Sequence, residues 1–234
     1  MMFGFNKLYR QHVKLRKFLF KGKTQSSWFL LSLVLLILLP FPISLFPNNK
    51  VLIFELSISL VVFFGVQLVS DTFRHFLTGL FLGGLALTFI WMHYLNGHLL
   101  LIKILRPIAI SAFLIFISYY LMTVLKRSKI IDINMIMVAI VGFLIMGIFG
   151  GQLCNLLNLA DSSAFNINPE DNSIFTLTYY SFTTLTSLGF GDILPQSAPA
   201  QSLSLLIGLS GQLYITILVA ILVGKYLMQN HNQV

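Results

Sequence analysis

The chain has 234 residues, of which 57% are hydrophobic and 9% are charged, and its mean hydropathy is +0.88. A soluble domain carries about 25% charged residues, so this composition excludes an ordinary soluble enzyme or binding domain and indicates an integral membrane protein. The net charge of +8 requires no nucleic-acid partner, because the basic residues gather at a few points between apolar runs. The single cysteine, Cys154, excludes an intrachain disulfide.

Six apolar runs in the sequence have the length of a membrane span. A hydrocarbon core of about 30 Å needs about 20 helical residues at about 1.5 Å of rise per residue. We therefore predict an all-α integral membrane protein with six transmembrane helices. The predicted spans, in chain order, are Trp28–Phe46, Val51–Ser70, Phe76–Leu95, Pro107–Leu125, Ile133–Leu157 and Ala200–Met228.

The distribution of basic residues predicts the orientation of these spans. Seven basic residues precede Trp28, three more lie between the fourth and fifth spans, and Lys225 lies near the end of the last span. With six spans all of them face one side, which the positive-inside rule makes the cytoplasm. We expect a multi-pass protein of the cell membrane (plasma or inner) with both termini cytoplasmic and anionic lipids near the basic N-terminus. Residues Phe5–Phe20 fit a basic amphipathic helix on the inner leaflet and an unstructured flank equally well.

An interrupted region of about 40 residues separates the fifth and sixth spans, far more than a simple turn needs. Its run IFTLTYYSFTTL is expected to form about three helical turns, after a cap at Asp171, Asn172 or Ser173. This helix is too short to cross a bilayer, so we predict that it is re-entrant. The following TSLGFGD must then run back outward. Non-helical backbone at membrane depth persists only where it is buried in protein or lines a watery path.

The glycines of TSLGFGD predict an ion path. Gly189 and Gly191 remove the steric penalty on backbone conformations that other residues avoid. Alternation with the bulkier Leu188 and Phe190 is expected to aim successive carbonyls toward one axis, where their oxygens replace the water shell of a monovalent cation. One chain supplies only one such strand, so a closed ring needs several copies.

The run SFTTLTSLGFGD combines hydroxyl residues, both glycines and an acid between membrane helices. It resembles the pore helix and selectivity filter of the tetrameric potassium channels, whose usual core is TVGYGD. The resemblance extends from about Ile133 to Met228 and is similar in type to small bacterial six-span members of the two-helix-pore ion channel superfamily. It implies a homotetramer that conducts potassium passively through a ring of carbonyls. The alternative is a non-conducting or weakly selective cation-channel-like membrane subunit.

The resemblance assigns roles within the filter by position. The implied ion-binding segment is Thr186, Ser187, Leu188, Gly189, Phe190, Gly191 and Asp192, with potassium bound through Ser187, Leu188, Gly189 and Phe190. The Ser187 hydroxyl is expected to close the innermost ion site, and Asp192 to brace the outer mouth. Phe190 lacks the hydroxyl that usually tethers the filter to its pore helix. Tyr179 and Tyr180 stand where an aromatic pair often surrounds the filter.

The last span carries the predicted gate. Gly208 and Gly211 interrupt it at IGLSGQLY, and two interpretations remain open, namely close packing against the pore helix and a hinge. The spacing from the filter to Gly211 resembles the hinge-glycine spacing of simple potassium channels. If the hinge applies, Gln212 and Ile215 face the central cavity. Val219 and Val223 then narrow the path further toward the cytoplasm.

These patterns divide the chain into a basic cytoplasmic N-terminal segment (1–27), a four-helix peripheral membrane domain (28–125), a pore domain (126–228) and a short cytoplasmic tail (229–234). Lys103 and Arg106 lie just before the fourth span, and no basic residue follows until Lys126, so the span carries too few charges for steep voltage gating. We expect both to reach the outer interface, with Glu55 as a partner. No enzyme activity is expected, and no cofactor other than potassium as the permeant ion.

Overall fold

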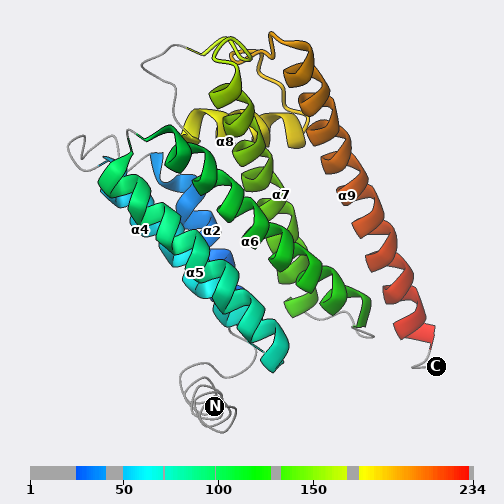
Figure 1. The fold of residues 1–234 in the computed structure, drawn as a ribbon. Helices are drawn as coiled ribbons and strands as arrows, with labels where there is room; N and C mark the ends of the chain where they lie inside the picture. The colour runs from blue at the N-terminus through cyan, green and yellow to red at the C-terminus, as the bar shows by residue number, and fades with distance from the viewer. Residues whose placement is uncertain are drawn as a thin grey trace, which may run out of the picture.

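The computed structural model describes residues 25–40, 50–70, 72–97, 99–127, 133–167 and 174–231. In these ranges the chain is almost entirely helical (Figure 1). The helices are α2 (Gln25–Leu38), α4 (Lys50–Leu68), α5 (Phe73–Asn96), α6 (Leu100–Arg127), α7 (Ile133–Ala160), α8 (Ile174–Leu185) and α9 (Ala198–His231). The same ranges contain no β-strand beyond one isolated bridge between Phe165 and Pro195. The predicted all-α class is confirmed.

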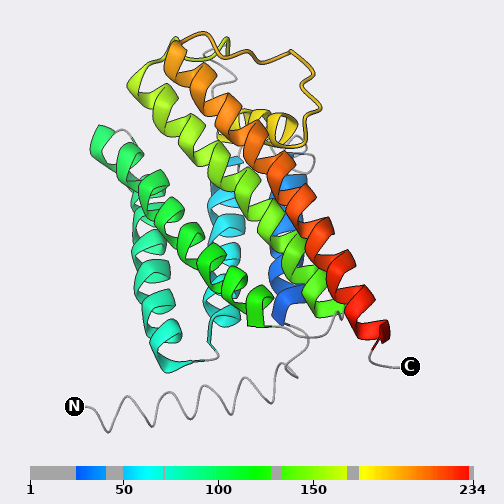
Figure 2. The same cartoon turned by 90° about the vertical axis from the view of Figure 1, so that its right-hand side faces the viewer.

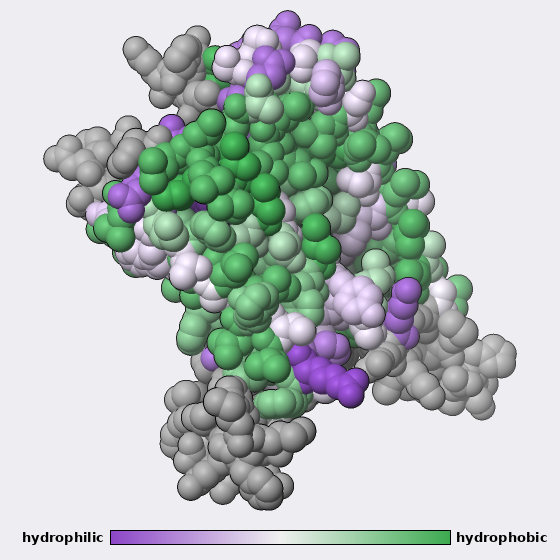
Figure 3. All heavy atoms as spheres, in the orientation of Figure 1, coloured by the Kyte–Doolittle hydropathy of each residue, from purple (hydrophilic) through white to green (hydrophobic). Residues whose placement is uncertain are grey.

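Five of these helices, α4, α5, α6, α7 and α9, are long and apolar enough to cross a bilayer. On the face of the molecule that Figure 3 shows, apolar residues cover most of the surface and the more hydrophilic residues gather mainly toward the ends. Helix α2 has 14 residues, which span about 21 Å at about 1.5 Å per residue. It ends at Leu38, two residues before Pro40, and residues 41–46 of the predicted first span lie outside the described residues. The chain is a multi-pass membrane protein, and its total of six spans stays a prediction.

Helix α6 begins earlier than the predicted fourth span. It starts at Leu100 and continues through Pro107, so the apolar run LLIKIL is helical. The added turns carry Lys103 and Arg106 into the helical bundle.

The long helices alternate in direction along the chain. Helices α2 and α7 begin, and α6 and α9 end, at the lower side of the bundle, whereas α8 lies near the opposite side (Figures 1 and 2). The helix ends that adjoin the basic segments therefore lie together. This arrangement agrees with the predicted common side of those segments, while the orientation in a membrane stays a prediction.

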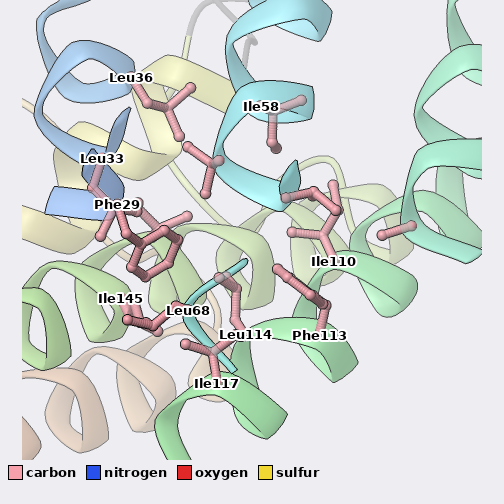
Figure 4. Close-up of a cluster of buried hydrophobic side chains, with 14 of the residues drawn as sticks. Phe29, Leu33, Leu36, Ile58, Leu68, Ile110, Phe113, Leu114, Ile117 and Ile145 are labelled. Atoms are coloured by element: carbon pink, nitrogen blue, oxygen red, sulfur yellow. The ribbon is translucent and has the colours of Figure 1, made fainter. Parts of the chain in front are cut away.

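Two groups of buried apolar side chains hold the bundle together. The larger group joins α2, α4, α5, α6 and α7 and includes Phe29, Phe113 and Ile145 (Figure 4). The smaller group joins α7, α8, α9 and the loop after α7, and it includes Cys154 and Leu177. Helices α2 and α6 pack against α7, whereas α9 packs mainly against α7 and α8. Helix α7 is therefore the element shared by both groups.

Candidate ion-conduction site

Helix α8 occupies Ile174–Leu185, the run expected to form a short helix between two spans. Its 12 residues span about 18 Å at about 1.5 Å per residue, too little to cross a bilayer. It lies across the direction of α7 and α9, near one end of the bundle (Figure 1). The predicted short helix is confirmed, and its predicted cap at residues 171–173 lies outside the described residues.

Glycines of α7 allow α8 to pack unusually close to it. A Cβ at Gly147 would lie 2.2 Å from the Phe182 ring, and one at Gly151 would lie 2.8 Å from the Thr178 Cα. The buried Ser181 hydroxyl donates a hydrogen bond to the Gly147 carbonyl at 2.8 Å. Sequence analysis did not single out these glycines. The signal that identifies them is the clustering of small residues on one apolar helix, which marks close helix contacts in membranes.

The backbone after α8 alternates in conformation. The φ angle is +61° at Ser187, +53° at Gly189 and +80° at Gly191, whereas Leu188 and Phe190 between them keep negative φ. Such an alternation turns successive N–H groups toward one side of a strand and leaves the carbonyls on the other. Glycine adopts positive φ without steric cost, which accounts for two of the three positions.

Hydrogen bonds direct the first N–H groups of this segment back to α8. The Ser187 N–H donates to the Thr184 carbonyl at 3.0 Å, and those of Leu188 and Gly189 donate to the Thr183 carbonyl at 2.9 and 3.1 Å. Among the described residues, no backbone–backbone hydrogen bond ends on a carbonyl of residues 187–191. These oxygens remain available to a ligand beside the C-terminus of α8, where the helix dipole favours a cation.

Aromatic residues of α8 contact the outer part of the predicted filter, residues 186–192. The Tyr179 ring stacks on Phe190, with ring centroids 6.5 Å apart and planes within 8°. The Tyr179 side chain also hydrogen-bonds Asp192, the residue expected to brace the outer mouth. The Tyr180 hydroxyl lies 2.5 Å from the Ser204 hydroxyl of α9. The two tyrosines therefore have different contacts, since Tyr179 faces the filter and Tyr180 joins α8 to α9.

The segment that follows the filter is hydrogen-bonded to the loop after α7. The Asn166 N–H donates to the Leu194 carbonyl at 3.1 Å, and the Asn166 Oδ1 accepts a hydrogen bond from the Leu194 N–H. The Gln196 N–H donates to the Ala164 carbonyl at 2.8 Å. Sequence analysis missed Asn166, because its partner lies 28 residues away.

Helix α9 approaches the base of the filter through its glycines. A Cβ at Gly211 would lie 2.0 Å from the Leu185 carbonyl oxygen, whereas one at Gly208 would lie 3.6 Å from its nearest neighbour. This contact supports the packing interpretation of Gly211, and the hinge stays a prediction. The Gln212 Nε2 donates to the Ser187 hydroxyl oxygen at 2.7 Å. A hollow of about 550 Å³ lies beside this contact, between α9, the end of α8 and the filter.

The remaining predicted gate residues line the exposed side of α9. Ile215, Val219 and Val223 are 43%, 53% and 52% exposed. Their side chains are therefore not used in packing within one chain and are open to a path shared with other copies.

Three ionisable side chains meet among the peripheral helices, away from the filter. The buried Glu55 carboxylate accepts a hydrogen bond from Arg106 Nη2 at 3.0 Å and lies 3.0 Å from His93 Nδ1. The predicted Glu55–Arg106 pair is confirmed, but the expectation that Arg106 reaches the interface was wrong. Arg106 lies in the helical part of α6 that was not predicted, and it is buried against Glu55 and Phe54. The Arg106 guanidinium lies 5.2 Å from the centroid of the Phe54 ring, which meets the Phe175 ring of α8 edge-on at 4.5 Å.

A sequence model of the family described as "Ion channel" matches residues 153–228. The matched region, about a third of the chain, contains the end of α7, all of α8, the filter segment and nearly all of α9. No curated protein and no solved structure matches the chain. The match supports the resemblance inferred from the filter motif, because residues 153–228 are similar to the ion channel family and include that motif.

Proposed function

We propose that four copies of this chain form a channel that conducts potassium selectively and passively. The observation that carries the proposal is the alternation of positive φ at Ser187, Gly189 and Gly191, beside carbonyls that no backbone N–H occupies. A ring of such carbonyls replaces the hydration shell of a potassium ion. The ion is the permeant ligand, and no enzymatic step forms part of the proposal.

Assembly into a tetramer is supported by the uncovered face of α9. Leu205, Leu206 and Leu209 are 68%, 65% and 60% exposed within one chain. Leu188 and Phe190 of the filter are also exposed, at 62% and 66%. A filter strand with unpaired carbonyls is costly in contact with lipid, because an unsatisfied backbone group there costs several kcal/mol. Neighbouring copies would cover both the strand and the inner helices.

We propose the cell membrane as the location, with the ends of α6 and α9 cytoplasmic. The basic residues that precede α2 are outside the described residues, but their number in the sequence favours the cytoplasmic leaflet and its anionic lipids. The filter exit then faces outward. Labelling of a single cysteine introduced at either side of the membrane tests this orientation.

Steep voltage gating is not part of the proposal. Moving one charge through the whole field supplies about 2.3 kcal/mol per 100 mV, and steep gating needs about three or four charges per subunit. Helix α6 carries only Lys103 and Arg106 before its last turn. Arg106 is paired with buried Glu55, so its movement would leave an uncompensated charge.

A non-conducting or weakly selective subunit is the second candidate. The observation that favours it is Phe190, whose ring has no hydroxyl to bond with α8 and is held on one face by stacking on Tyr179. A filter supported in this way is expected to be less rigid than one with a tyrosine at that position.

Ion flux into liposomes that contain only the purified full-length protein separates the two candidates. We expect a potassium gradient to drive flux and an equal sodium gradient to drive little. Gly191→Ala is the matched control, because it inserts the same helices but disfavours φ of +80°. Equal potassium and sodium flux would remove the selectivity claim, and no flux would favour the non-conducting subunit. Light scattering in mild detergent tests the tetramer, which a stable monomer would contradict.

A further inference from the structure

We infer that Gln212 of α9 is a positioning residue for the innermost cation site of the filter. Its side-chain amide holds the Ser187 hydroxyl in the orientation in which that oxygen binds a dehydrated cation arriving from the inner helices. This inference rests on the proposed function, and it adds a specific role for a side chain that lies outside the filter.

The contact joins two elements that are separate in the sequence. The Gln212 Nε2 lies 2.7 Å from the Ser187 oxygen, and the two residues are 25 positions apart. The amide reaches Ser187 because α9 passes unusually close to the end of α8. The preceding Gly211 brings its backbone so near that a Cβ would lie 2.0 Å from the Leu185 carbonyl oxygen. Both side chains are exposed in one chain, so no other residue of that chain separates them from the proposed path.

The backbone of Ser187 explains why this position needs support. Ser187 is the one non-glycine residue with positive φ among the described residues. A side chain in this conformation is strained, and such strain persists only where the surroundings hold it in place. Two hydrogen bonds hold Ser187, one from its N–H to the Thr184 carbonyl and one from Gln212 to its hydroxyl oxygen. Gly189 and Gly191 adopt positive φ without such help.

The direction of the hydrogen bond determines what the hydroxyl can offer an ion. A serine hydroxyl has one hydrogen to donate and two lone pairs, whereas an amide nitrogen can only donate. The Ser187 oxygen must therefore be the acceptor in this contact, which leaves one lone pair for a cation. Without the amide, the hydroxyl is free to turn among three staggered rotamers, and its hydrogen can then face the ion. Loss of Gln212 should therefore weaken cation binding at this site.

Block by internal Ba²⁺ measures the affinity of the site, because Ba²⁺ has nearly the radius of K⁺ and twice its charge. We expect Gln212→Leu to weaken Ba²⁺ block by about three- to tenfold, the range that corresponds to the loss of one hydrogen bond. Potassium selectivity over sodium should stay near that of the wild type, because the carbonyl strand is retained. The matched control is Thr216→Val, since the Thr216 hydroxyl bonds only the carbonyl of Gln212 in its own helix. Its block should equal that of the wild type.

A double-mutant cycle tests whether Gln212 acts through Ser187. In a Ser187→Ala background, we expect Gln212→Leu to have no further effect on block. An equal effect in both backgrounds, an unchanged block in Gln212→Leu, or a tighter block would overturn the positioning role. If wild-type liposomes show selective potassium flux but the double-mutant cycle shows no coupling between Gln212 and Ser187, this inference alone is refuted. Wild-type liposomes without potassium flux would refute the proposed function and this inference together.

Discussion

Replacing Gly211 with alanine places a methyl group against the end of helix α8. The added Cβ would lie 2.0 Å from the Leu185 carbonyl oxygen, 2.9 Å from its carbonyl carbon and 3.0 Å from its Cδ1. A carbonyl in the last turn of a helix cannot rotate away as the end of a side chain can. Either α9 moves outward or the end of α8 shifts, and the filter begins at the next residue, Thr186.

The expected loss of stability follows from two opposing effects. Overpacking of a tight contact costs about 1–3 kcal/mol. Alanine in a helix interior is favoured over glycine by about 1 kcal/mol. Because the nearest atom belongs to the backbone, we expect a net loss of about 1–2 kcal/mol for each chain. In a chain of this size each kcal/mol shifts the melting temperature by about 2–4 °C, so Tm should fall by about 2–8 °C.

Thermal unfolding of the purified protein in mild detergent measures this change, and the same helix provides two controls. A Cβ at Gly208 would meet nothing closer than 3.6 Å, and one at Gly224 would meet nothing within 4 Å. Gly208→Ala and Gly224→Ala should therefore keep or raise Tm. A Tm for Gly211→Ala that matches these controls would refute the close-contact reasoning. Single-channel recordings add a second distinction, because a hinge alone changes open probability without altering selectivity, whereas displacement of the pore helix changes both.

Four other substitutions, at three places in the structure, have defined outcomes. Gly189→Ala and Gly191→Ala force a side chain into positive φ, which costs about 1–2 kcal/mol for each residue. Selective potassium flux should therefore be lost, while the protein still reaches the membrane fraction. Retained selectivity would contradict the assigned filter. Arg106→Gln leaves the buried Glu55 charge without its guanidinium and should destabilise the protein by about 3–5 kcal/mol in thermal unfolding, with recovery in the Arg106→Gln, Glu55→Gln double variant. Steep voltage dependence in the wild type that disappears in Arg106→Gln would show instead that α6 senses voltage. Asn166→Ala removes the acceptor for the Leu194 N–H. Hydrogen exchange at that amide should accelerate by about tenfold, as expected for the loss of about 1.4 kcal/mol of local protection. Unchanged exchange would show that other contacts hold this segment in place.

The short helix before the filter was predictable from the sequence in detail. The run from Ile174 to Leu185 is too short to span a bilayer and ends shortly before Gly189 and Gly191, and these local signals required no knowledge of packing. The same signals supported the ion channel prediction, because two glycines that alternate with bulkier residues directly after a short helix suit a path lined by carbonyls. The start of α6 was misplaced, because the predicted span began at Pro107 although the preceding apolar turns are helical.

Contacts between distant parts of the chain were beyond the reach of sequence patterns. The bond from Gln212 to Ser187 depends on how closely α9 passes α8, which is set by the contact of Gly211 with Leu185. Sequence analysis placed Gln212 near a cavity but did not suggest its hydrogen-bond partner. The hydrogen bonding of Asn166 with Leu194 likewise depends on the fold of the loop after α7. A periodic pattern identifies the face of a helix, but it does not say which side chain on a neighbouring element that face meets.

The position of Phe54 determines which part of the pore the peripheral helices are able to influence. Its ring touches the Arg106 guanidinium of α6 on one side and the Phe175 ring of α8 on the other. Helix α9, in contrast, packs mainly on α7 and α8 and has no comparable contact with α4 or α6 among the described residues. Within a single chain, the contacts of Phe54 give the peripheral helices a direct path to α8, whereas a path to α9 runs through α7. In the proposed channel, a molecule that binds α4 or α6 therefore has a route to the pore helix that does not pass through the inner helix.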